Sequence, residues 1–221
     1  NPIDCCRDFD MSGVYLSDIT TEQTDRDFTN TKWKRAHGNA VNFQSATLSP
    51  EYKVFKLISA DTTGSHVLLG PRVTIRNRDL TDLNITGTNL TGTILSGSTM
   101  SWRADKNANE TVGCPSGLPD EYTCLKKNTS NTAFSYEDII VVGPFMDLSD
   151  VALEDYNFAG ISLDGASLRG VSGQLKGCPA KLPTGWGCDD QDRVLLGPGA
   201  HLFGVTLTNV MTTPPWKGRT A

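Results

Sequence analysis

Residues 146–173, MDLSDVALEDYNFAGISLDGASLRGVSG, decide the fold. The large apolar residues of this stretch recur at a strict spacing of five: Leu148, Leu153, Phe158, Leu163 and Leu168. That period fits neither an α-helix, with 3.6 residues per turn, nor a flat strand, in which side chains alternate with a period of two. The residue two before each centre is also mostly apolar, and an extended segment places residues i−2 and i on one side. The remaining two residues of each five are rich in Ser, Asp, Glu, Ala and Gly, which suit a corner. Each five therefore predicts one side of a polygon: three extended residues and a two-residue corner.

The same rhythm returns elsewhere in the chain and divides it into tracts. It is degenerate at first, where the register slips by two residues, and then becomes clean. The repeat tracts cover about 8–48, 73–102, 146–173 and 200–210, with loop insertions expected at about 49–66, 103–139 and 174–193. The centres expected to form the core are Ile75, Leu80, Ile85, Leu90, Leu95, Met100, Leu148, Leu153, Phe158, Leu163, Leu168, Leu202 and Leu207. We expect residues 1–221 to form a single interrupted solenoid, in which each coil is stable only against its neighbours.

A longer repeat lies over the five-residue rhythm. Each clean tract follows an apolar triplet and Gly-Pro: VLLGP at 67–71, IVVGP at 140–144 and VLLGP at 194–198. In all three copies the first centre lies four residues after the proline. Two of the insertions are also alike, GCPSGLPDEYTC at 113–124 and GCPAKLPTGWGC at 177–188. These agreements indicate a duplicated module.

The run DLSDVALEDYNFAGISLDGASLRG resembles the pentapeptide-repeat family, whose consensus is roughly A-(D/N)-L-x-x. The resemblance implies a right-handed quadrilateral β-helix with four sides per coil, in which the central Leu or Phe and the small residue two before it point inward. The chain departs from the consensus at Met146, Tyr156 and Ile161, where larger side chains replace Ala. The insertion pattern is similar to linker modules found in some pentapeptide-repeat proteins. The expected fold class is all-β: a right-handed quadrilateral β-helix with disulfide-closed loop insertions.

The cysteines favour disulfide bonds. Two cysteines ten residues apart, held by two prolines and an aromatic residue, indicate a local disulfide that closes a loop. Disulfides imply an oxidising compartment, either extracellular or the lumen of an organelle. Free or metal-bound thiols are the alternative, but no paired C-x2-C spacing of a zinc site occurs. The adjacent pair near the first residue fits a vicinal bond, a bond to another chain or a bond to a removed segment. The candidates are Cys114, Cys124, Cys178, Cys188, Cys5 and Cys6.

Composition and motifs point away from several functional classes. The formal net charge is −5 and the pI about 5.2, which argues against non-specific binding to nucleic acid or to anionic lipid. No apolar run approaches the ~20 residues of a membrane span. There is no catalytic or cofactor motif, and the three histidines are scattered. We expect no enzymatic activity, no metal and no cofactor.

Charged residues along the tracts have a plain interpretation as solvated outer surface. A calcium ladder or a carboxylate pair is the alternative interpretation of the acidic residues, but they lack the spacing of known calcium loops. A basic cluster around Trp33 would suit nucleic acid, but the acidic whole favours outward-facing charges beside an inward Trp. The acidic residues are Asp79, Asp82, Asp147, Asp150, Glu154, Asp155 and Asp164, and the basic cluster is Lys32, Lys34, Arg35 and His37.

Four Asn-x-Ser/Thr sequons are candidate glycosylation sites in a secretory protein. Asn109 and Asn128 lie in the polar insertion, which we expect to be exposed and flexible. Asn84 and Asn89 occupy the position before a repeat centre, where the resembled family itself favours Asn or Asp, so these two sequons follow from the repeat.

The function most consistent with these features is a non-enzymatic structural or interaction subunit. A rigid, disulfide-stabilised solenoid offers long flat surfaces for protein partners in an extracellular or lumenal assembly, and its open ends suit end-to-end stacking with copies of itself. One alternative is a nucleic-acid-mimicking topoisomerase-binding protein, as in some members of the resembled family. The other is a carbohydrate-binding module that uses Trp102, Tyr122, Trp186 and Trp216.

Overall fold

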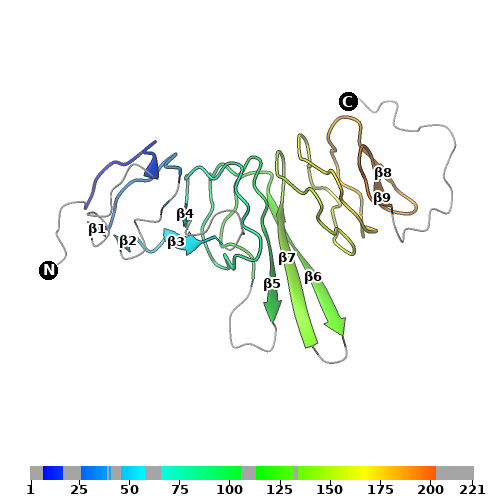
Figure 1. Cartoon of the computed structure of the whole chain (residues 1–221), viewed down its shortest axis with the longest axis horizontal. Helices are drawn as coiled ribbons and strands as arrows, with labels where there is room; N and C mark the ends of the chain where they lie inside the picture. Colours follow the sequence, from blue (N-terminus) through cyan, green and yellow to red (C-terminus); the bar gives the residue numbers. More distant parts are fainter. Residues whose placement is uncertain are drawn as a thin grey trace.

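The computed structural model describes residues 7–16, 26–38, 40, 46–57, 66–105, 113–131 and 134–202. These residues form strands, turns and single-residue β-bridges, and they contain no α-helix. The molecule is elongated, and chain order runs along its long axis from the N-terminal to the C-terminal part (Figure 1). The all-β class expected from the sequence is therefore confirmed for the described residues.

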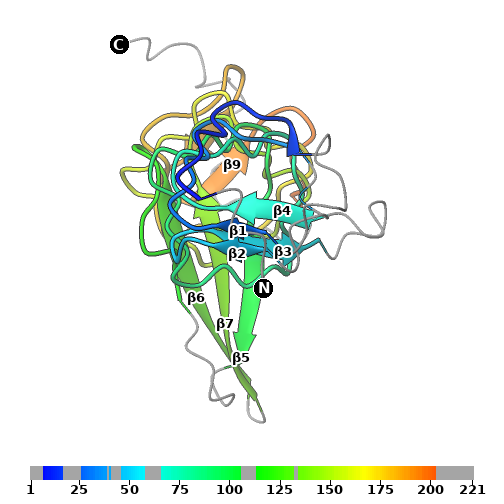
Figure 2. The ribbon, with the colours of Figure 1, turned by 90° about the vertical axis from the view of Figure 1, so that its left-hand side faces the viewer.

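Parallel pairing between residues about twenty apart organises most of the structure. Strands β1 (Asp27–Phe28) and β2 (Thr47–Leu48) pair in parallel, with Asp27 opposite Thr47. Isolated parallel bridges repeat this offset further along the chain: Thr74 with Ile94, Asp79 with Thr99, Asp147 with Ser167, Ala152 with Ser172 and Asn157 with Gly177. Each run of four five-residue units thus lies against the next, and in the end view the successive layers overlap (Figure 2).

The centres of the repeat form the core. Eleven of the expected centres are no more than 2% exposed: Ile75, Leu80, Ile85, Leu90, Leu95, Met100, Leu148, Leu153, Phe158, Leu163 and Leu168. Burying each such side chain contributes roughly 1.5–3 kcal/mol. Leu202 differs from expectation because it is 40% exposed, since no later layer covers it among the described residues. Leu207 lies outside the described residues.

Each five-residue unit ends in a tight turn with a left-handed residue. The carbonyl of Leu80 accepts a hydrogen bond from the N–H of Leu83 at 3.2 Å, and the residue between them, Asp82, has φ +62°. This is the pattern of a type II turn, whose third residue needs positive φ. Glycine meets that need without strain, as Gly87 does at φ +70° in the next unit.

The polar residue before each centre stabilises the turn that follows. Asp79 accepts a hydrogen bond from the backbone N–H of Thr81 at 3.0 Å, and Asp147 accepts one from Ser149 at 3.0 Å. Asn and Asp side chains commonly close such local turns. This contact gives the physical reason for Asn or Asp at that position of the repeat.

The three apolar-triplet segments each form one strand of an antiparallel pair. Strand β3 (Lys53–Lys56) pairs with β4 (His66–Leu69), and β8 (Gly187–Asp189) pairs with β9 (Val194–Leu196). Between them, β5 (Ser101–Asp105), β6 (Thr123–Asn131) and β7 (Phe134–Val142) form a sheet in the order β5-β7-β6. This sheet extends away from the stacked layers in both views (Figures 1 and 2).

The three pairs share one register and one packing contact. Val54 faces Leu68, Cys124 faces Val141 and Cys188 faces Leu195. In each pair an aromatic ring covers the glycine of the Gly-Pro that follows. The rings are Tyr52 over Gly70, Tyr122 over Gly143 and Trp186 over Gly197, and each lies two residues before the paired Val54, Cys124 or Cys188. A Cβ on any of these glycines would overlap the ring, which explains why glycine occupies all three positions.

We call the three copies of the antiparallel pair with its Gly-Pro turn the first (52–71), second (113–144) and third (177–198) modules. Disulfides close the second and third modules. Cys114 bonds to Cys124 and Cys178 bonds to Cys188, with Cα atoms 5.9 and 5.8 Å apart. The first module has Val54 at the corresponding position, so it carries no such bond there. Cys5 and Cys6 lie outside the described residues.

The insertions differ from the loops expected. Much of the insertion at 103–139 belongs to the β5-β7-β6 sheet. The β-branched run Ile139–Val142, at the end of β7, is buried in the core, and this burial fixes the position of β7. Within 174–193 the chain first continues the parallel stack, since Ser162 pairs with Lys181. Residues 53–56 of the first insertion form β3.

A matched glycine pair tests whether the layers pack through their corners. Gly87 and Gly97 have nearly equal φ, +70° and +71°, but a Cβ meets nothing at Gly87 and overlaps the Asn77 side chain at Gly97. Both Gly87→Ala and Gly97→Ala should cost about 1–2 kcal/mol for the left-handed backbone. Gly97→Ala should cost about 1 kcal/mol more, as overpacking does. Urea unfolding measures both, and Asn77→Gly should remove the excess. Equal losses would contradict the packing.

Removing one disulfide tests its contribution to stability. Cys114→Ala/Cys124→Ala opens a loop with a sequence separation of 10, and the chain-entropy model gives about 2–3 kcal/mol for a loop of this size. We expect a loss of that size in the free energy of unfolding, measured by urea under non-reducing conditions. Val54→Ala, at the equivalent position of the module without a disulfide, is the control for side-chain truncation. A double alanine variant no less stable than this control would contradict the expectation.

Candidate functional site

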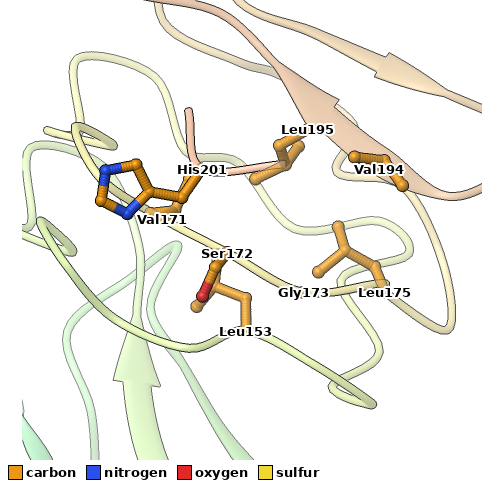
Figure 3. A pocket seen from close by; sticks show the side chains of 8 residues that line it. All are labelled: Leu153, Val171, Ser172, Gly173, Leu175, Val194, Leu195 and His201. Atoms are coloured by element: carbon orange, nitrogen blue, oxygen red, sulfur yellow. The ribbon is translucent and has the colours of Figure 1, made fainter. Parts of the chain in front are cut away.

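One small hollow is part of the core. It measures about 10 Å³ and is lined largely by apolar residues, including Leu153, Val171, Leu175 and Leu195. His201 also lines it, and its side chain lies beside Val171 at one end of the group (Figure 3). A space of this size holds one water at most, so it is a packing void.

A larger recess lies where the β5-β7-β6 sheet leaves the stacked layers. This sheet cleft measures about 430 Å³. Its floor contains two aromatic residues that are almost fully buried, Trp102 and Tyr156. The lining residues are Asp82, Ser101, Trp102, Arg103, Lys127, Asp138, Ile139, Ile140, Val151, Ala152 and Tyr156.

Two of the charged side chains in the sheet cleft form an ion pair, and a third lies over an aromatic ring. Arg103 Nε lies 2.7 Å from Asp138 Oδ1, and Lys127 Nζ lies 5.3 Å from the centre of the Tyr156 ring. The second contact is a cation–π interaction. Trp102 Nε1 is buried without a hydrogen-bond partner among the described residues. The cleft offers no nucleophile beside a base, so its chemistry is that of packing and polar contact.

Burial in the sheet cleft raises the pKa of Tyr156 above its ordinary value. Loss of solvation is the main cause, the nearby Asp138 carboxylate adds to it, and the Arg103 guanidinium opposes it. Burial disfavours the charged phenolate, as does a neighbouring negative charge. Tyr156 is therefore held neutral at the junction between sheet and stack.

A second recess, of about 420 Å³, surrounds Phe145 and is called here the Phe145 groove. Its other walls include Asn77, Asp79, Asp147 and Ser167. Phe145 is 56% exposed, and it has φ +58°. A left-handed conformation is unusual for a bulky side chain and costs roughly 1–2 kcal/mol.

The three Gly-Pro turns allow an internal comparison for Phe145. Each turn places a residue with positive φ directly after the proline: Arg72, Phe145 and Gly199. Glycine in the third module shows that the turn itself needs no side chain at this position. The Phe145 ring does lie over Gly165 of the next layer, yet more than half of its surface remains open. An exposed aromatic side chain in a costly backbone conformation is typical of an interaction site.

Three of the four sequon asparagines lie among the described residues. The side chains of Asn84 and Asn89 accept hydrogen bonds from the N–H groups of Thr86 and Thr91 at 3.1 and 3.0 Å, as their place in the repeat requires. Asn128, expected in a flexible segment, pairs with Glu137 in the sheet. Asn109 lies outside the described residues.

The aromatic residues proposed for carbohydrate binding have little free ring surface. Trp102 is 3% exposed, while Tyr122 and Trp186 cover the glycines of their modules. The Tyr122 hydroxyl also donates to the Pro144 carbonyl at 2.7 Å. Trp216 lies outside the described residues.

The charged residues expected on the outer surface are exposed or half-buried, and some of the acidic ones also accept hydrogen bonds in turns. The seven acidic residues from Asp79 to Asp164 are exposed or half-buried, and Lys32, Lys34, Arg35 and His37 are exposed around a fully buried Trp33. Across the described ranges, no group of three or more His, Cys, Asp or Glu side chains is placed to hold a metal ion, and no helix could span a membrane.

Sequence reasoning missed both recesses. Phe145 carries a readable signal, because it is a bulky residue at the position after Gly-Pro where the third module has glycine. The sheet cleft carries none, since it forms only when β5 returns to pair with β7, 35 residues later.

Comparison of the chain with protein-family models, with curated proteins and with solved structures found no match in any of the three searches.

The Tyr156 environment predicts a stability difference at alkaline pH. Because the pKa of Tyr156 is raised in the folded state, its contribution is complete below the unfolded value of ~10 and declines as the pH rises above it. Tyr156→Phe should therefore lose less stability than the wild type between neutral pH and pH values above 10, as measured by urea midpoints. Tyr15→Phe, which alters an exposed ring, is the control. Identical pH dependence in Tyr156→Phe and wild type would contradict the burial of this hydroxyl.

Proposed function

We propose that the chain is a non-enzymatic interaction subunit: a rigid, disulfide-stabilised β-solenoid that docks onto protein partners in an extracellular or lumenal assembly. The fold proposed is the right-handed quadrilateral β-helix of pentapeptide-repeat proteins. Parallel pairing at an offset of twenty supports it, because four sides of five residues make one coil. Two disulfides support an oxidising compartment.

One observation carries the docking role: Phe145 stands exposed at the rim of a groove. Exposed aromatic anchors beside a recess are common centres of protein interfaces, surrounded by contacts that exclude water. The rigid layers beneath hold the ring in place, since Gly97 donates a hydrogen bond to the Phe145 carbonyl at 2.6 Å and Phe145 donates one to Asp164 at 2.9 Å. Preorganisation of this kind lowers the entropic cost of binding.

The two alternatives receive less support. A nucleic-acid mimic needs continuous negative charge, whereas Arg72 and Arg76 are exposed on the layers of the cleanest tract. A carbohydrate module needs open aromatic faces, and the described candidates pack against the protein itself.

Site-specific photo-crosslinking tests the docking role. The photoreactive analogue p-benzoylphenylalanine replaces Phe145 in one variant and the exposed Thr91 in the control variant. After irradiation with the protein fraction of the compartment from which the chain derives, we expect discrete crosslinked products at position 145 that unlabelled wild type competes away. Products that are equal at positions 145 and 91, or that resist competition, would contradict a docking site in the Phe145 groove.

A further inference from the structure

We infer that a second copy of this chain is a partner: a basic surface near the N-terminal end of one copy binds the Phe145 groove of the next. This inference rests on the proposed docking function and names its partner. It differs from stacking of solenoid ends, because both surfaces lie on the sides of the layers.

The acidic surface consists of Phe145 and four carboxylates around it. Asp79 and Asp147 line the groove itself, together with one cation, Arg78. The two carboxylates flank the layer of Ser98 and Thr99, because Asp79 pairs with Thr99 and the N–H of Asp147 donates to the Ser98 carbonyl at 3.1 Å. Asp82 and Asp150 stand at the corners that follow. None of the four carboxylates forms an ion pair among the described residues.

The basic surface consists of Lys32, Lys34, Arg35 and Arg72, all exposed. Arg35 and Arg72 are adjacent on the stack, since the N–H of Arg35 donates to the Arg72 carbonyl at 2.7 Å. None of these four cations forms an ion pair among the described residues. Two carboxylates lie near them: Asp10, whose backbone pairs with Lys32, and Glu51, which acts on Tyr52 together with Arg72. Four cations against two carboxylates leave the surface a positive excess.

Exposed apolar side chains accompany both surfaces. Phe9 and Tyr15 are 54% and 47% exposed, and Tyr15 lies against His37 at 5.3 Å between ring centres, in the layer next to the basic residues. With Phe145 they make three of the four large hydrophobic residues that are exposed in the described parts; the fourth is Leu202. Each surface therefore combines an exposed aromatic side chain with an excess of one charge, and the two excesses are opposite in sign.

Two longer stretches of the sequence carry net charges of opposite sign and similar size. Residues 26–78 contain nine Lys and Arg against three Asp and Glu, a net charge of +6, whereas residues 137–192 contain three against ten, a net charge of −7. The two regions meet at the Phe145 groove, where Arg78 of the first lies in the lining with Asp147 of the second. Lys32, Lys34 and Arg35 lie in an earlier layer, since Arg35 donates to the Arg72 carbonyl and chain order follows the long axis of the molecule (Figure 1). These cations can therefore reach the groove of a second copy, and electrostatic complementarity of this kind selects partner and orientation.

The contact joins two different surfaces, so each copy in an assembly retains one free surface of each kind. Such heterologous contacts produce rings or open chains of copies. This geometry allows a test in which two variants, each defective in one surface, restore each other. Lys32→Glu/Lys34→Glu removes the basic surface, and Asp79→Asn/Asp82→Asn/Asp147→Asn/Asp150→Asn neutralises the acidic one. Asn keeps the turn hydrogen bonds and tolerates the left-handed corners.

Sedimentation velocity over a hundredfold concentration series provides the measurement. We expect the wild type to form species larger than a dimer at low salt and to dissociate at high salt, because exposed charges are screened. Each variant alone should associate at least tenfold more weakly, and an equal mixture of the two should form a dimer and nothing larger. Phe145→Gly should also weaken association while leaving the protein folded.

The matched control is Lys176→Glu/Lys181→Glu, which makes the same change in net charge at exposed positions away from both surfaces. It should associate like the wild type. A wild type that is monomeric throughout, a mixture that fails to dimerise, or a control as defective as Lys32→Glu/Lys34→Glu would each overturn the inference. A monomeric wild type that still gives competed crosslinks from position 145 to another protein would leave the docking function standing and assign the groove to a foreign partner.

Discussion

The constraint on which the structure depends is the turn that closes each five-residue side. A carbonyl at the centre of the side accepts a hydrogen bond from the N–H three residues later, and the residue before that N–H must adopt positive φ. This turn sends the chain around a corner and returns it to the same place twenty residues later. The inward position of every side then meets its equivalent in the next layer, which is why an apolar residue at every fifth position suffices to build a core.

The same turn explains how side chains and glycines are distributed along the corners. At three left-handed corners the next layer carries glycine where the layer before it carries a side chain: Asn77 lies over Gly97, Phe145 over Gly165 and Asp150 over Gly170. A Cβ on any of these glycines would overlap the side chain that lies over it, whereas Arg35 and Arg72 follow each other at successive left-handed corners without a glycine. The exposed side chains of the corners therefore form an irregular but rigid pattern, and such a pattern suits specific recognition.

Much of the stack could be predicted from the sequence, because the five-residue period reports a local constraint that repeats. The buried centres from Ile75 to Met100 and from Leu148 to Leu168 lie where the rhythm places them. The sheet β5-β7-β6 could not be predicted in this way. Its register depends on the pairing of Trp102 with Ile139, which are distant in sequence and carry no periodic signal. The sheet cleft and the position of Tyr156 follow from that pairing, so they were hidden as well.

Insertion of whole and half periods tests the twenty-residue period of the pairing most directly. Duplicating residues 149–168 adds twenty residues and returns every later side to its original face. Duplicating residues 149–158 adds ten and rotates all later layers by half a coil, which takes the third module out of register with the layer that supports it. The measurement is thermal unfolding followed by circular dichroism. We expect one cooperative transition near the wild-type Tm for the twenty-residue insertion and loss of cooperativity for the ten-residue insertion. Equal behaviour of the two variants would contradict a twenty-residue period.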